Sequence, residues 1–441
     1  MLATQVFARY AAQSRAQSLP PEVMHHAKRA VVDWYASVYP GLSAEPVPRL
    51  EEVLADDLDH GHARLILGRP ATPRAAALIN GAAAHAAEVD DSFREAMYHP
   101  GAATIAAALA AAQAADATGS DFLRGIVLGY EVSTRIGVVL GRGHYKYWHN
   151  TGTVGTFGAA AAAGALLGLD ETQFAHALAT AATFAAGLQQ AFRMDSMSKP
   201  LHAGRAAEAG LLAAQLAARG VTGSLDVLDG EAGLGAAMST NADWSQLGAT
   251  LGQDFHITRI TFKNHIGCGH SFPSIDGALE LQRLHGFRAQ DIESVRIGTY
   301  KPALDIACYT RPASINEARF SIPYVVATAL VHGSVRMAAY EAQRLRDPAT
   351  LELLERIHAG VDPELDAAFP GRRSARVEVL LRDGRRLTHL QPNRKGDPEL
   401  PLSDADLENK LLELASPVIG ADASHALAAR LWNLDTSPAT P

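Results

Sequence analysis

Residues 152–168 read GTVGTFGAAAAAGALLG, which is a stretch of mostly small residues at helical length. Small side chains let neighbouring helices approach closely, so several stretches of this kind together predict a tightly packed helical core with a buried central helix. The run from Gly155 to Leu167 is mostly Ala and Gly and falls short of the ~20 strongly apolar residues that a membrane span requires. We therefore expect a core helix and no membrane partner.

Segments of the same kind fill the first 260 residues, with Gly, Pro and Asp between them and almost no β-branched alternation. They are 21–39, 101–117, 121–141, 171–190 and 203–219. We predict a large all-helical domain over residues 1–262.

The pattern changes after Phe262. Residues 294–300 alternate, and residues 376–381 and 385–390 flank Asp383-Gly384 as two strands around a tight turn. Helical stretches at 274–285 and 322–332 are interleaved with these strands, so we predict a smaller α+β domain over 263–397. Residues 394–398 resemble a linker, and a capped helix at 403–414 predicts that residues 398–441 return to the helical domain. The predicted fold class is mainly α.

Charge and cysteine content limit the partners and the compartment. The chain has 441 residues, 39 Lys plus Arg against 47 Asp plus Glu, and a formal net charge of -8, so nothing in its charge attracts nucleic acid or anionic lipid. Its two cysteines cannot form a disulfide framework, and the N-terminus lacks the pattern of a secretory leader. We expect a cytoplasmic protein that does not bind nucleic acid.

Three motifs place a titratable side chain immediately before a small-residue helix. They are His99-Pro100-Gly101, His149-Asn150-Thr151-Gly152 and Lys199-Pro200-Leu201-His202. Unpaired N–H groups and the positive end of the helix dipole can bind carboxylates without a metal. Any one of these residues alone is more often a surface or capping residue, but three such motifs in one chain weaken that interpretation.

Acidic residues precede the first of these motifs. Glu88, Asp90 and Asp91 follow an apolar small-residue helix and could supply a base or orient a neighbouring His or Lys, although ordinary solvation of a helix end is the commoner role. Tyr145, four residues before His149, could bring a phenol to the same place, although a lone Tyr is more often a packing residue.

A metal or nucleotide cofactor is not expected. His265, Cys268 and His270 are close in sequence, but they offer only three ligands, without a CxxC or HExxH spacing. The sequence contains neither a GxGxxG or GxxxxGK[ST] phosphate loop nor a GxSxG nucleophile motif.

Several motifs in a fixed order make the chain recognisable, and it resembles the MmgE/PrpD family from about residue 5 to about residue 415. That family contains 2-methylcitrate dehydratase, cis-aconitate decarboxylase and iminodisuccinate epimerase. The motifs are Asn80-Gly81-Ala82-Ala83-Ala84-His85, Asp90-Asp91-Ser92, His99-Pro100, Gly143-His144-Tyr145, His149 to Gly155, Lys199 to Gly204, and Glu317-Ala318-Arg319-Phe320-Ser321.

The resemblance implies a cofactor-free homodimer with a large helical domain, built from both ends of the chain, and a smaller α+β lid domain that closes over a site between the two domains. By motif, the catalytic residues would be His149, Tyr145, Lys199, His99 and Asp91, and the substrate-binding residues Asp90, Ser92, Lys263, Cys268 and Tyr309. Two departures from the family pattern matter: Glu88 replaces a common Asp, and Cys268 replaces a His of the decarboxylase pattern. The second departure counts against a decarboxylase.

Reactions of this family share the formation or quenching of a carbanion next to a carboxylate, which fixed cations and N–H dipoles can stabilise. Lys199 and Lys263 suit that task, and His149 and His99 suit proton transfer. We predict a dehydratase-type lyase acting on a branched hydroxy di- or tricarboxylate, with 2-methylcitrate the leading substrate. Epimerisation of a substituted dicarboxylate and decarboxylation of an aconitate-like acid stay open, as does a non-catalytic dimer that binds polycarboxylates.

Overall fold

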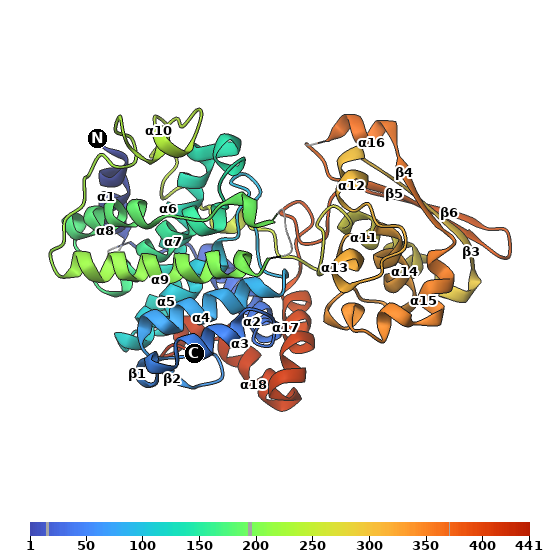
Figure 1. Cartoon of the computed structure of the whole chain (residues 1–441), viewed down its shortest axis with the longest axis horizontal. Helices are drawn as coiled ribbons and strands as arrows, with labels where there is room; N and C mark the ends of the chain where they lie inside the picture. The colour runs from blue at the N-terminus through green and yellow to red at the C-terminus, as the bar shows by residue number, and fades with distance from the viewer. Residues whose placement is uncertain (15–16, 193–195, 370) are drawn as a thin grey trace. The chain divides into compact units, whose positions relative to one another are not determined.

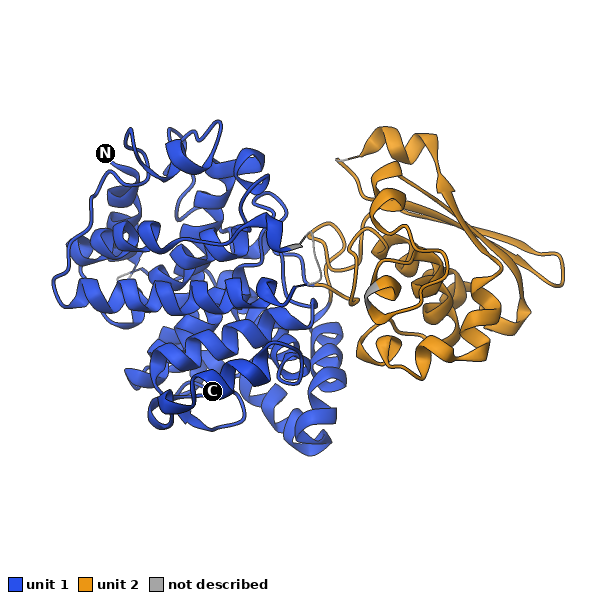
Figure 2. Ribbon diagram, viewed as in Figure 1, with its two compact units in different colours: residues 1–262, 403–441 blue, residues 263–402 orange. Residues whose placement is uncertain are grey.

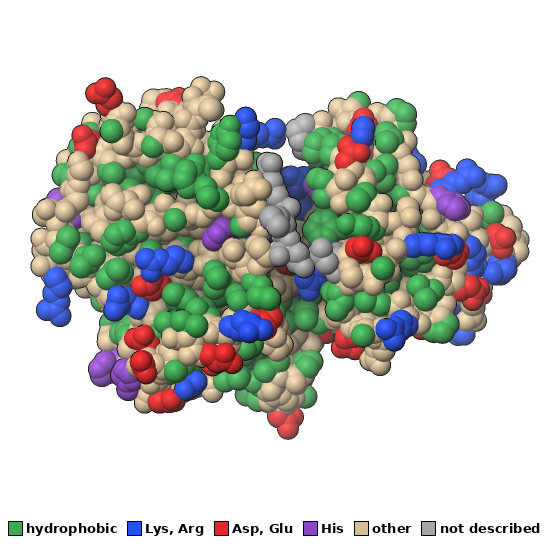
Figure 3. Space-filling model, in the orientation of Figure 1, with side chains coloured by type: hydrophobic (Ala, Val, Ile, Leu, Met, Phe, Trp, Pro, Cys, Tyr) green, Lys and Arg blue, Asp and Glu red, His purple; other side chains and the backbone are tan. Residues whose placement is uncertain are grey.

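The computed structural model describes residues 1–14, 17–192, 196–369 and 371–441, which form two compact units (Figure 2). The first combines Met1–Phe262 with Ser403–Pro441, and the second is Lys263–Leu402. Residues 398–402, which we expected to return to the helical domain, stay with the second unit, where the backbone N–H of the nearby Lys395 donates to Asp276 Oδ2 at 2.7 Å. Charged side chains of both signs are spread over the visible face of each unit (Figure 3).

Helices make up most of the first unit (Figure 1). They are α1 (Ala3–Ser14), α2 (Pro21–Gly41), α3 (Val47–Val53), α4 (Pro73–Ala86), α5 (Pro100–Ala114), α6 (Gly119–Tyr145), α7 (Asn150–Leu166), α8 (Glu171–Phe184), α9 (Ser198–Ala218), α10 (Leu234–Met238), α17 (Asp404–Ile419) and α18 (Ala421–Trp432). No helix of the described residues is both long and apolar enough to cross a bilayer.

The α7 helix lies at the centre of this unit. It packs against α5, α6, α8 and α9, and every one of its residues from Asn150 to Gly164 is buried. The contact with α9 is very close: a Cβ atom on Gly210 would lie 2.5 Å from the Cβ of Ala159. The prediction of a buried central helix with small side chains is confirmed.

A two-stranded antiparallel ladder is the exception to the helical character of the first unit. It joins β1 (Leu58–Arg64) to β2 (Pro70–Ala71), with a register shift between Leu58 and Ala63. Of the seven residues of β1, only Leu58 and Ala63 are buried, so the strand lacks the alternation by which a sequence reveals a strand. The all-helical description of this unit was therefore slightly wrong.

The second unit has a four-stranded sheet in the order β4-β3-β5-β6, with β3 and β4 parallel and the other neighbours antiparallel. On β5 every second residue is buried, and α11 packs on β5 and β6. Its elements are α11 (Phe272–His285), β3 (Ile292–Thr299), α12 (Lys301–Ile306), α13 (Ile315–Arg319), α14 (Ile322–His332), α15 (Pro348–Leu354), β4 (Ile357–Val361), α16 (Pro363–Ala368), β5 (Ala375–Leu381) and β6 (Arg386–Gln391). The predicted α+β character and the hairpin at Asp383-Gly384 are confirmed.

Candidate active site

Four histidines gather in the first unit, each near an end of a different helix. His85 is in the last turn of α4, His99 and His149 directly precede α5 and α7, and His202 is in the first turns of α9. The ring of His85 lies 4.9 Å from that of His99 and 5.5 Å from that of His149, and the rings of His149 and His202 are 5.2 Å apart, centroid to centroid. We call these four residues the histidine cluster.

Close contacts at glycines bring these helix ends together. A Cβ atom on Gly204 of α9 would lie 2.3 Å from the carbonyl oxygen of Leu78 on α4, so a side chain there would push the two helices apart. A Cβ atom on Gly152 would lie 2.4 Å from the carbonyl oxygen of Ala186 and 3.2 Å from the Cβ of His202. The cluster therefore depends on glycine in the first turns of α7 and α9.

His149 and His202 form a hydrogen bond between their Nδ1 atoms, which are 3.0 Å apart, so one ring donates and the other accepts. The backbone N–H of His149 donates to the carbonyl of Gly187 at 2.9 Å, just after α8 ends at Phe184. Burial lowers the pKa of His149 well below 6.5, and the neighbouring His85 and the Lys199 ammonium lower it further. His149 is therefore a neutral imidazole at pH 7.

Lys199 forms an ion pair with Glu88 beside the histidine cluster. The α9 helix begins at Ser198, so Lys199 lies inside its first turn and not ahead of it as the sequence suggested. Glu88 has a φ of 60°, in the left-handed region, directly after α4. That sharp turn directs its carboxylate to Lys199, which places one cation and one anion beside neutral imidazoles.

His85, Asp90 and His99 have ligand-type atoms within 4.8 Å of one another, and among the described residues they are the group that could hold a metal ion. However, His99 Nδ1 lies 2.6 Å from the carbonyl oxygen of Asp91, which can only accept a hydrogen bond, so this nitrogen carries a proton. His85 Nδ1 lies 2.7 Å from Asp90 Oδ2 and is likewise placed to donate. The trio could bind a metal through these atoms only if both rings lost those protons.

Asp91 is anchored on both carboxylate oxygens. Oδ1 accepts from the backbone N–H of Gly101 at the start of α5 at 2.9 Å, and Oδ2 accepts from the hydroxyl of Tyr130 at 2.7 Å. Burial raises the pKa of Asp91 to about 8, the Asp33 and Asp90 carboxylates add to this, and the two hydrogen bonds oppose it. This geometry suits a residue that orders the start of α5 better than one that transfers protons to a ligand.

Within the described part of the chain, neither Ser92 nor Tyr145 makes a hydrogen bond or a ring contact with the histidine cluster. The backbone of Ser92 pairs with that of Thr261, with N–O distances of 2.8 and 2.9 Å. Tyr145 ends α6, and its side chain is 39% exposed. The structure thus supports a backbone role for Ser92 and places Tyr145 at the surface.

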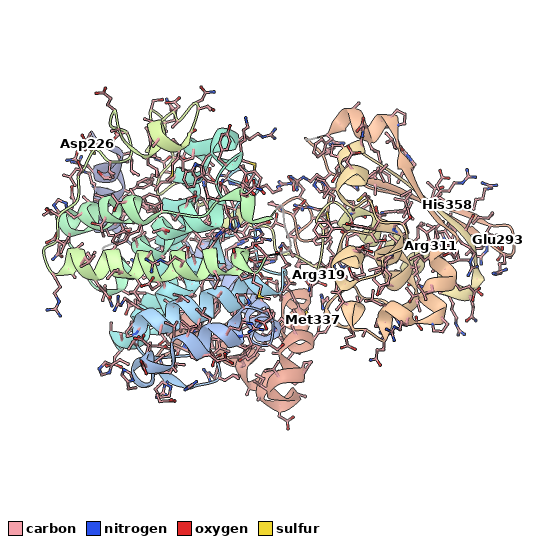
Figure 4. The ribbon with its side chains drawn as sticks, viewed as in Figure 1. Asp226, Glu293, Arg311, Arg319, Met337 and His358 are labelled. Atoms are coloured by element: carbon pink, nitrogen blue, oxygen red, sulfur yellow. The ribbon has the colours of Figure 1, made fainter. Side chains whose placement is uncertain are left out.

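Lys263, Cys268 and Tyr309 belong to the second unit. Cys268 is buried, its backbone N–H donates to the carbonyl of Arg319 at 2.9 Å, and burial raises the pKa of its thiol. Arg319, labelled in Figure 4, lies at the end of α13 with its guanidinium 5.5 Å from the ring centroid of Tyr340. Tyr309 is 39% exposed. The assignment of these three residues to substrate binding rests on the resemblance and stays a prediction.

Two histidines of the cluster, His85 and His202, were absent from the predicted site, whereas Glu88 was named as a group that could orient a neighbouring His or Lys, and it pairs with Lys199. Both histidines stand inside motifs that the sequence displays, but neither directly precedes a helix. The sequence offered one clue to His85, which is its spacing of five residues from Asp90. That spacing covers about one helical turn and the residues that follow the end of α4, so the two side chains can lie close together.

Comparisons with known proteins cover nearly the whole chain. Residues 5–247 match the MmgE/PrpD N-terminal domain, and residues 265–435 match the MmgE/PrpD C-terminal domain. Two relatives are each 28% identical to this chain: the cis-aconitate decarboxylase-like protein oryM of Aspergillus oryzae, over 95% of this chain and 92% of that protein, and the cis-aconitate decarboxylase of Homo sapiens, over 95% and 88%. The cis-aconitate decarboxylase of Aspergillus terreus is 26% identical, over 93% and 88%.

Proposed function

Because the chain belongs to the MmgE/PrpD family, we propose that it is a cofactor-independent dehydratase-type lyase acting on a small branched hydroxy di- or tricarboxylate. The leading substrate is 2-methylcitrate. The observation that carries this proposal is a buried, neutral His149 whose neighbours are a second neutral imidazole, His202, and the Lys199 ammonium.

A neutral imidazole beside a cation suits the removal of a proton from carbon. His149 would take the proton from the carbon next to a substrate carboxylate, and the two electrons of that C–H bond would delocalise into the carboxylate. Lys199 and the positive end of the helix dipole at the start of α7 would stabilise the developing negative charge. The hydroxyl on the adjacent carbon then takes up a proton, its C–O bond breaks, and it leaves as water. The electron pair of the carbanion forms the C=C bond.

Decarboxylation is the second candidate, because the relatives reported above carry that activity in their names. Loss of CO2 from an aconitate-like acid leaves a carbanion that must gain a proton, so this reaction consumes one proton per turnover. A site whose buried histidine has a pKa well below 6.5 is better prepared to accept a proton than to deliver one. The buried Cys268, where the decarboxylase pattern has a His, also favours dehydration.

The test is a panel of acids, with 2-methylcitrate and cis-aconitate as the central pair, assayed in deuterated water and in the presence of a chelator. We expect an alkene product from 2-methylcitrate, deuterium exchange at the carbon that loses the proton, and no release of CO2. Release of CO2 with proton uptake from cis-aconitate would replace dehydration by decarboxylation. Exchange with inversion at carbon and no loss of water would indicate epimerisation, and tight binding of an acid without exchange or product would indicate a binding protein.

The same family membership supports a homodimer, and the two cysteines, too few for a disulfide framework, support a cytoplasmic location. Light scattering at micromolar concentration should return twice the mass of one 46.7 kDa chain. A monomer mass would contradict the proposed assembly.

A further inference from the structure

One oxygen of Asp90 faces two imidazoles. Asp90 Oδ2 lies 2.7 Å from His85 Nδ1 and 3.4 Å from His99 Nδ1. The side chain of Asp90 is 1% exposed and that of His85 is fully buried, so water does not compete for these contacts. The family resemblance implies a substrate-binding role for Asp90, but its surroundings are those of a group that acts on other side chains.

The residues on both sides of Asp90 are held firmly, so its carboxylate has little freedom to move. The carbonyl of Val89 accepts a hydrogen bond from Lys410 Nζ at 2.8 Å, and Lys410 also forms a buried ion pair with Asp33 at 2.5 Å. On the other side, Asp91 is bound to Gly101 and Tyr130 as described above. The C-terminal segment thus fixes the backbone that carries Asp90.

The chemistry of these contacts determines the protons on both rings. The carbonyl of Asp91 accepts from His99 Nδ1, and a carboxylate oxygen accepts from His85 Nδ1. A neutral imidazole carries one N–H, so both rings then hold their lone pair on Nε2. The Nε2 atom of His85 is fully buried and has no hydrogen-bond partner among the described residues. A buried acceptor in this state can accept a hydrogen bond from a ligand.

We infer that Asp90 is a positioning residue that locks His85 as the Nδ1–H tautomer, while the backbone carbonyl of Asp91 holds His99 in the same tautomer, so that two Nε2 lone pairs, one buried and one partly exposed, lie next to His149. The tautomer assignment stands on geometry alone, whereas its value for catalysis rests on the proposed function. In a reaction that first removes a proton from carbon, a His85 ring held in one tautomer spares the site the reorganisation of a ring that would otherwise sample both tautomers.

Nitrogen NMR of the protein labelled at its histidine nitrogens tests the tautomers without any substrate, because the chemical shift separates a protonated from an unprotonated ring nitrogen. The His85→Asn and His99→Asn variants assign the signals by difference. We expect both rings of the parent protein to be protonated at Nδ1, and Asp90→Asn to shift His85 toward a mixture of tautomers. The inference is overturned if either ring of the parent protein is protonated at Nε2 instead, or if Asp90→Asn leaves the tautomer of His85 unchanged.

A kinetic test uses whichever acid turns over. Asp90→Asn should lower kcat by at least about tenfold while KM changes by less than about threefold, since a lost tautomer preference affects proton transfer more than binding. His85→Asn keeps a donor for Asp90 but removes the distal nitrogen, and it should also lower kcat. The matched control is His256→Asn, a buried histidine of the same unit whose Nδ1 bonds to Thr134 Oγ1 at 3.0 Å, and kcat should be unchanged there.

The alternative is a zinc ion bound by the same three side chains, His85, Asp90 and His99. Calorimetric titration of the parent protein with Zn²⁺ should show no binding that Asp90→Asn removes. Tight binding of one ion per chain that depends on Asp90, with loss of the Nδ1–H signals, would overturn the tautomer lock in favour of a metal site. If Asp90→Asn does not fold, the spectrum of the parent protein and the His85→Asn kinetics still decide between the two.

Discussion

The molecule contains two buried His–Asp pairs with nearly the same contact and different surroundings. In the first unit His85 Nδ1 lies 2.7 Å from Asp90 Oδ2, and in the second unit His265 Nε2 lies 2.8 Å from Asp276 Oδ1. The side chains of both pairs are at most 5% exposed. As isolated motifs they would be given the same role.

The two His–Asp pairs differ in the residues that surround them. The ring of His85 is stacked on that of His149 and tilted against that of His99, and its distal nitrogen has no partner among the described residues. His265 packs edge-on against Phe272 at 5.5 Å, and the second oxygen of Asp276 holds the backbone N–H of Lys395. The first pair therefore belongs to a set of titratable groups, whereas the second ties the segment after β6 to the start of α11. What surrounds the far side of a His–Asp pair decides its function.

The largest effect on activity is expected from removing the Lys199 ammonium, which lies beside the histidine cluster. Lys199→Ala should lower kcat/KM by roughly 10²-fold or more, the scale of losing a donor that stabilises charge in the transition state. Steady-state kinetics measure this, and Lys199→Arg, which keeps the charge, should retain a larger share of activity. Equal kinetics for the alanine variant and the parent would remove Lys199 from the mechanism.

The next effect concerns His149. His149→Asn keeps a donor toward His202 but removes the titrating ring, so kcat should fall by about 10²-fold while KM changes little. Because burial holds the pKa of His149 below 6.5, the parent should keep its kcat/KM as the pH falls from 8 to 6.5 and lose it only at more acidic pH, where this base becomes protonated. A pH profile of kcat/KM for both proteins provides the check, and an unchanged turnover in the variant contradicts the assignment of a base.

His265→Gln breaks the second His–Asp pair and sharpens the comparison. It leaves Asp276 buried without its ring partner, which should cost about 1–3 kcal/mol of unfolding free energy. kcat should stay within about threefold of the parent, less than 1 kcal/mol in activation free energy. Thermal unfolding and kinetics on the same preparation measure both, and a large fall in kcat without a loss of stability would make the two pairs alike.

Cys268→Ala should have the smallest effect. If the buried thiol only fills space, the variant loses about 1 kcal/mol of stability and changes kcat/KM by less than about threefold. The matched control is Cys308→Ala, at an exposed cysteine of the same unit. A loss of activity comparable to that of His149→Asn would mean that the thiol has taken over the work of a missing histidine.

Much of the fold could be predicted because it follows from local patterns. The small-residue segments predicted α2, α5, α6, α7 and α9, and the alternation at 294–300 predicted β3. The irregular strand β1 escaped prediction because it lacks alternation, and α8 ended at Phe184, earlier than predicted, because Ala185 is extended and Gly187 has a φ of 128°. Those backbone conformations are set by contacts with other segments.

For the site, the sequence alone determined the family and the residues at helix starts, since His99, His149 and Lys199 are marked by the signals of a helix N-terminus. Only the tertiary structure decided that His85 and His202 join them, that Glu88 pairs with Lys199, and that Asp90 and Asp91 hold other side chains and a helix start. The physical reason is that glycine contacts between α4, α7 and α9 set which helix ends meet. A hydrogen bond between residues far apart in the chain, such as the one from Lys410 to Val89, leaves no periodic mark in the sequence.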